Sequence, residues 1–154
     1  MANDVTHFIV VRYDDDEGDR PNYMKYLATE ITEEINGKRV AIYAMSHDES
    51  LNHATKYLQQ LLSENVRQKT KLSVIDTHLE LQSDEDFIKI HVSYAKMHCG
   101  KSDNQVLIFV CDSRDCDNLS NYLHQDIMER IKHHSALTIK LIGDSETHSL
   151  LTPH

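Results

Sequence analysis

The sequence of 154 residues lacks long apolar runs, and this absence excludes a helix that spans a membrane. Its apolar runs reach only about six residues, whereas a membrane-spanning helix needs about 20. The first residues, MANDVTH, also lack the basic segment and the apolar stretch of a secretory signal. We therefore expect a protein that is neither secreted nor inserted into a membrane.

The chain is also poor in basic residues and in cysteine. It has 16 Lys and Arg against 25 Asp and Glu, which gives a formal net charge of -9. Because nucleic acids and anionic lipid surfaces both attract basic faces, this balance predicts neither partner and favours a basic protein surface instead. Three cysteines without framework spacing fit a reducing compartment better than a disulfide scaffold, so we expect a cytoplasmic protein.

What remains is the composition of an ordinary globular protein. Hydrophobic residues make up 40% of the chain and charged residues 27%, without an internal repeat or a shift of composition along the sequence. Residues 1–154 are therefore predicted to form one domain.

Strand-like and helical patterns alternate along the chain. The expected strands are short apolar runs at residues 7–12, 39–45, 71–75, 105–111 and 136–142. The expected helices repeat apolar residues at helical spacing at residues 22–35, 51–62, 84–97 and 119–131. This order predicts a three-layer α/β/α fold with a mostly parallel central sheet. The segment THSLLT near the C-terminus is expected to return as an antiparallel edge strand, which would form a C-terminal antiparallel hairpin.

Three polar segments directly follow predicted strands: RYDDD, MSHDES and CDSRDCD. In a parallel sheet the carboxyl ends of the strands share one edge, where α/β proteins bind ligands. A pocket therefore explains these segments, although any one of them also fits the polar loop that must end every strand.

The order of these segments resembles the histidine phosphatase family, also called the phosphoglycerate-mutase-like superfamily, and in size its short phosphohistidine phosphatases. The family opens with a strand that leads into Arg-His-Gly, where this chain reads FIVVRY with Arg12 and Tyr13. Ser46 matches the family's Ser-Pro, Ser50 replaces its next arginine, and Cys111 ends the strand that carries its second catalytic histidine. The resemblance implies the same α/β fold and a pocket lined by Arg12, Tyr13, Ser46, Ser50 and Cys111.

The departures from the family pattern concern the residues that perform its reaction. The resemblance implies an imidazole that attacks phosphorus, a second imidazole and two arginines around the phosphoryl oxygens. Of this set only Arg12 is present. We therefore predict a catalytically inactive pseudophosphatase that binds a phosphorylated ligand or a basic protein partner, without a cofactor or a metal. The direct competitor is an active phosphomonoesterase or phosphohistidine phosphatase of the same family.

A second alternative is a receiver-like phosphoacceptor domain. Asp76 follows the third predicted strand and would accept the phosphoryl group, while Asp14 and Asp15 would hold a magnesium ion, because clustered carboxylates suit hard cations. Against this alternative, Cys111 stands where a Ser or Thr is expected, and Lys140 lies inside a predicted strand rather than at its end.

A transition-metal site is a weaker interpretation. His91, His98 and Cys99 fall near one end of the third predicted helix, and His133 and His134 are adjacent elsewhere. Neither group has the spacing of a known Cys/His metal signature, and a chain with 11 His contains neighbouring histidines by chance.

Cys111 itself has two interpretations. A thiol at the end of a strand serves as a nucleophile when its pKa is lowered. Asp112, Asp115 and Asp117 would raise that pKa instead, so we expect Cys111 to be a small buried residue that closes the strand.

Overall fold

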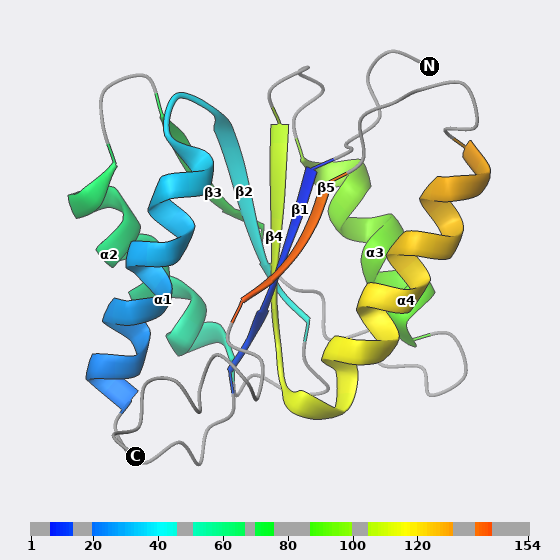
Figure 1. The fold of residues 1–154 in the computed structure, drawn as a ribbon, viewed down its shortest axis with the longest axis horizontal. Helices are drawn as coiled ribbons and strands as arrows, with labels where there is room; N and C mark the ends of the chain where they lie inside the picture. Colours follow the sequence, from blue (N-terminus) through cyan, green and yellow to red (C-terminus); the bar gives the residue numbers. More distant parts are fainter. Residues whose placement is uncertain are drawn as a thin grey trace.

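The computed structural model describes residues 7–13, 20–45, 51–66, 70–75, 87–99, 105–130 and 138–142. Strands and helices alternate through these segments (Figure 1). In chain order they are β1 (His7–Arg12), α1 (Arg20–Ile35), β2 (Arg39–Ala44), α2 (Asn52–Asn65), β3 (Lys71–Ile75), α3 (Phe87–His98), β4 (Gln105–Cys111), α4 (Ser113–Arg130) and β5 (Thr138–Ile142). The predicted α/β order is confirmed.

The strands form one five-stranded sheet in the order β3-β2-β4-β1-β5. Every strand pair within the described segments is parallel. The expected C-terminal hairpin has no support there, because β5 runs parallel to β1 and the segment THSLLT lies outside the described residues.

The strand order places the helices on both faces of the sheet. The chain moves through α1 and α2 toward β3, and then through α3 and α4 in the opposite direction, toward β5. Because such crossovers are right-handed, opposite directions put the two helix pairs on opposite faces. Figure 1 shows α1 and α2 on one side of the sheet and α3 and α4 on the other, as a three-layer fold requires.

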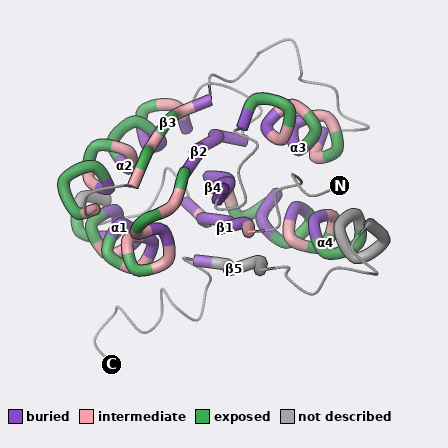
Figure 2. Tube along the Cα trace, turned by 90° about the horizontal axis from the view of Figure 1, so that it is seen from above, coloured by how far each residue is buried: buried purple, intermediate pink, exposed green. Residues whose placement is uncertain are grey.

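The core consists of two hydrophobic clusters, one on each face. Along β1, Ile9 and Val11 face α1 and α2, whereas Phe8 and Val10 face α3 and α4. All seven residues of β4 are buried, and Figure 2 shows the buried residues concentrated in the central strands. Continuous apolar runs are typical of parallel strands that are covered on both faces, which is why these segments lack the alternation of a half-exposed strand.

The helix ends show where local sequence determines the structure. Gly37 follows the end of α1 with φ of 79°, a left-handed conformation that glycine adopts without steric cost. The backbone N–H of Gly37 also donates to Thr70 Oγ1 at 2.7 Å. By contrast, α4 begins at Ser113, six residues before the predicted start at Leu119. The segment CDSRDCD, expected as part of a pocket or as a polar loop after β4, contains the start of this helix instead, and Asp112 caps it.

A buried polar contact ties α3 to the sheet. The hydroxyl of Tyr43 on β2 forms a hydrogen bond with Nδ1 of His91 on α3, and both residues are fully buried. The Tyr43 ring also meets Phe109 edge to face, at a centroid distance of 6.1 Å. The two polar groups lose their contacts with water on folding, and this hydrogen bond replaces one such contact for each of them.

We expect Tyr43→Phe to destabilise the fold by about 1–3 kcal/mol, because it keeps the ring but removes a hydrogen-bond partner of the buried imidazole. The half-exposed Tyr57 on α2 offers the matched control, and Tyr57→Phe is expected to change stability by less than about 0.5 kcal/mol. Urea unfolding of the two variants measures the difference. Equal midpoints would show that the hydrogen bond contributes nothing.

Candidate functional site

The central strands β1 and β4 end side by side at the carboxyl edge of the sheet. Arg12 is the register partner of Cys111, and the pairing continues one residue further, because the Tyr13 N–H donates to the Cys111 carbonyl at 2.8 Å. On the other side of β4, the Met45 N–H donates to the Val110 carbonyl at 2.8 Å. The two strand ends are therefore fixed relative to each other by backbone hydrogen bonds.

This junction is the topological switch point of the sheet. The chain leaves β1 through α1 on one face and leaves β4 through α4 on the other face. Connections that diverge in this way open a crevice outside the strand ends, and α/β proteins bind ligands there. The predicted edge thus lies at the carboxyl ends of β1 and β4, where the structure describes Tyr13 and the start of α4.

Arg12 places a cation at this edge. Its Nε donates to Ser113 Oγ at 2.5 Å, so the guanidinium of β1 lies against the first residue of α4. Its backbone carbonyl accepts a hydrogen bond from the Tyr23 hydroxyl of α1 at 3.2 Å. Arg12 therefore contacts the helices on both sides of the switch point, and its side chain remains partly exposed.

The structure separates Tyr13 from Cys111. Arg12 is the register partner of Cys111, and Tyr13 comes one residue later. Because successive side chains point to opposite faces of the sheet, Tyr13 and Cys111 point to opposite faces. Tyr13 packs with the cluster under α1 and stacks against Tyr23, with ring centroids 6.2 Å apart. Cys111 is fully buried in the cluster under α3 and α4. These two side chains therefore belong to different halves of the core rather than facing each other.

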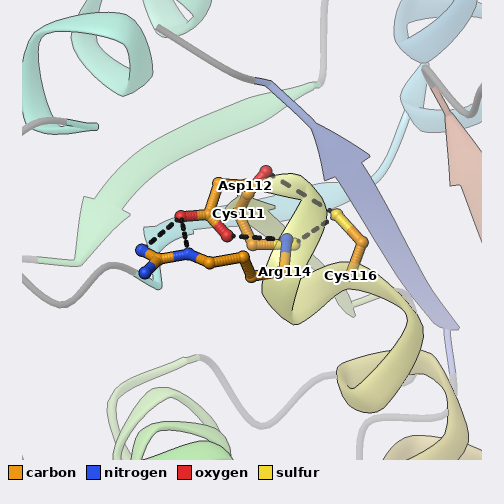
Figure 3. Close-up of polar contacts among 4 residues, drawn as sticks. All are labelled: Cys111, Asp112, Arg114 and Cys116. Carbon is orange, nitrogen blue, oxygen red and sulfur yellow. Dashed lines mark hydrogen bonds and ion pairs between the residues drawn. The ribbon is translucent and has the colours of Figure 1, made fainter.

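Asp112 organises the N-terminus of α4 (Figure 3). Its Oδ1 accepts a hydrogen bond from the Arg114 N–H at 3.0 Å, and its backbone carbonyl accepts from the N–H groups of Asp115 and Cys116, each at 3.1 Å. The same carboxylate pairs with the Arg114 guanidinium, with Nη2 and Oδ2 2.9 Å apart. The carboxylate thus occupies the position at the helix N-terminus where an external anion would otherwise bind.

The Cys111 thiol is unsuited to act as a nucleophile toward a bound ligand. Its hydrogen bond with Cys116 raises its pKa well above the usual range, and burial and the nearby carboxylates of Asp115 and Asp112 raise it further. The attacking species is the thiolate, so this environment suppresses it. The predicted role of Cys111 as a buried residue that closes β4 is confirmed.

Several predicted site residues lie outside the described segments. Among the pocket residues these are Ser46 and Ser50, and among the receiver residues they are Asp14, Asp15 and Asp76. The strand order nevertheless bears on the receiver alternative, because receiver domains have the order 2-1-3-4-5 and this sheet has 3-2-4-1-5.

The described residues contain no group of three or more His, Cys, Asp or Glu that could hold a metal ion. His91 is engaged with Tyr43 in the core, and the Cys99 thiol donates to the Lys96 carbonyl at 3.3 Å. The ring of His98 packs against that of Tyr94 at the end of α3, with centroids 4.3 Å apart. His133 and His134 lie outside the described residues.

Four residues of this edge were absent from the predicted pocket: Ser113, Asp112, Arg114 and Cys116. A signal for the cap was present in the sequence. An Asp followed three residues later by another acid, as in DSRD, is a form of the capping-box pattern that begins a helix. The contacts of Ser113 and Cys116 have no such local signal, since they depend on how α4 docks beside β1 and β4.

No protein-family model matches this chain, and neither curated proteins nor solved structures show significant similarity to it. Among the described helices, none combines the length and the apolar character needed to cross a membrane. The proposed function therefore depends on the fold and on the residues at the carboxyl ends of β1 and β4.

We expect Asp112→Ala to destabilise the protein by about 1 kcal/mol, within the range of about 0.5–2 kcal/mol for lost N-caps. Asp112→Asn keeps a capping oxygen and is expected to recover most of the stability. Asp117→Ala removes the same charge from the same helix but no capping bond, and serves as the control. If Asp112→Ala and Asp117→Ala unfold at the same urea concentration, the cap does not stabilise α4.

Proposed function

We propose that this chain is a catalytically inactive, histidine-phosphatase-like binding domain that recognises a phosphorylated side chain on a basic protein or peptide. The observation that carries the proposal is the position of Arg12 at the switch point of the sheet, with its guanidinium partly exposed beside α4. The switch point is where this class of fold binds ligands, and a guanidinium is the side chain best suited to hold a phosphate.

The electrostatics of the edge favour Arg12 over the helix terminus as the phosphate contact. The cap carboxylate of Asp112 already accepts a hydrogen bond from the N–H of Arg114. The partial positive charge at the N-terminus of α4 is therefore compensated within the protein. Arg114 in turn offsets the Asp112 charge, at an N–O distance of 2.9 Å. An unscreened carboxylate 4 Å from a phosphate would cost about 1–4 kcal/mol per charge pair, so this internal pairing reduces the repulsion that a bound anion meets.

The proposed lack of catalysis follows from the residues at the two family imidazole positions. Tyr13 is buried and stacked on Tyr23, and a phenol is a weak nucleophile near neutrality unless a base or a cation activates it. Cys111 is fully buried. Loss of a nucleophile that works as part of a catalytic unit costs on the order of a millionfold in rate, because the other members of the unit then have nothing to act on.

The net charge of -9 supports the proposed partner chemistry. A free phosphate would be repelled by the acidic surface at long range, whereas a basic segment that carries the phosphate would be attracted. The proposal therefore specifies a phosphorylated residue flanked by Lys or Arg. Binding of this kind weakens as salt is added, because exposed charges are screened beyond about 8 Å at physiological ionic strength.

We expect Arg12→Ala to weaken binding of a Lys-rich phosphopeptide roughly 10- to 100-fold, which corresponds to the loss of a charged hydrogen bond of about 1.5–3 kcal/mol. Isothermal titration calorimetry with the phosphorylated peptide and its unphosphorylated twin measures the effect. Arg39→Ala is the matched control. Arg39 is an exposed arginine at the amino end of β2, whereas Arg12 lies at the carboxyl end of β1.

Two outcomes would contradict the proposal. Equal affinity for the two peptides would show that the phosphate is not recognised. Turnover of an aryl phosphate that persists through purification and disappears in Arg12→Ala would identify an active phosphatase, the competing function within the same family.

A further inference from the structure

Cys111 and Cys116 place two thiols together just behind the capped start of α4. Their Sγ atoms are 2.8 Å apart, closer than sulfur atoms that merely pack against each other. Cys111 ends β4, and Cys116 lies in the first turn of α4, where its N–H is held by the Asp112 carbonyl at 3.1 Å. The strand end and the helix cap therefore fix both members of the pair.

The hydrogen bonds distinguish the two sulfurs. The Cys116 thiol is placed to donate to the Cys111 carbonyl at a distance of 3.6 Å, and in that arrangement the Cys111 thiol donates to the Cys116 sulfur. Cys116 is 3% exposed and Cys111 is 0% exposed, so Cys116 is the less deeply buried residue of the pair. Of the two residues, Cys116 is therefore the one that we expect a small oxidant to reach first.

We propose that Cys111 and Cys116 form a redox pair, a modification site in which a hydroperoxide converts the two thiols into an intramolecular disulfide. This inference does not depend on the proposed binding function. The third cysteine provides a contrast, because Cys99 directly follows α3 and its thiol donates to the Lys96 carbonyl at 3.3 Å.

The reaction balances with hydrogen peroxide as the oxidant. The Cys116 sulfur attacks one peroxide oxygen, the O–O bond breaks, and the departing hydroxide takes the Cys116 thiol proton to form water. The Cys111 sulfur then attacks the adjacent sulfenic sulfur, where the proximity of the two sulfurs offsets the raised pKa of Cys111, and the S–S bond forms as the S–O bond breaks. The second hydroxide takes the Cys111 proton, so the two thiols and one peroxide give one disulfide and two waters.

The chain is suited to a direct test, because trypsin separates the three cysteines. Cleavage at Lys96, Lys101, Arg114 and Arg130 places Cys99, Cys111 and Cys116 in three different peptides, comprising residues 97–101, 102–114 and 115–130. A link between the second and third peptides then reports a disulfide between Cys111 and Cys116 rather than one that includes Cys99.

We expect a small molar excess of hydrogen peroxide to lower the thiol count of the unfolded, alkylation-quenched chain from three to one. Mass spectrometry should find peptides 102–114 and 115–130 joined, and dithiothreitol should restore three thiols. Cys99→Ser should still lose its two remaining thiols, whereas Cys116→Ser should retain both of its own.

Three results would overturn the inference: a count that stays at three, a disulfide that includes Cys99, or irreversible oxidation of Cys116 without a link. Because the primary measurement uses the unmodified chain, it does not depend on whether a cysteine variant folds.

Discussion

The pairing of β1 with β4 is the constraint on which the rest of this structure depends. The two strands run in register from His7 opposite Val106 to Arg12 opposite Cys111, in the middle of the sheet. The helices that follow them lie on opposite faces of the sheet. Side chains at the ends of these strands therefore pack against different helices. Arg12 reaches Ser113, Tyr13 packs beside Tyr23, and Cys111 meets Cys116 for this one reason.

The start of α4 then determines what this edge offers chemically. Asp112 ends the strand segment, caps the helix and pairs with Arg114. A carboxylate in this position stabilises the helix through its dipole while it occupies the site where a phosphate commonly binds. A further cation at the edge is supplied by Arg12 of β1, and the thiol pair is buried behind the cap. Stability of the helix and chemistry of the site therefore involve the same few residues.

The fold was more predictable from the sequence than the site. The bounds of β1, β3 and β4 were predicted correctly. β1 and β4 are apolar runs that stop at polar residues, and β3, with the sequence KLSVI, alternates polar and apolar residues like a half-buried strand. The start of α4 was missed, because its first turn is polar and lacks the apolar repeat from which the helices were predicted. The contact of Arg12 with Ser113, 101 residues apart, depends on the strand order, which hydrophobic periodicity does not encode.

Native-state hydrogen exchange of the Tyr13 and Met45 amides tests the central claim most directly. Both N–H groups lie one residue beyond their strands and donate to β4 carbonyls at 2.8 Å. If β4 fixes both neighbouring strand ends, these amides should exchange only through global unfolding, with the same free energy as Ile9 in the middle of β1. Rapid exchange of both amides at rates typical of unstructured peptides, while Ile9 remains protected, would contradict the account.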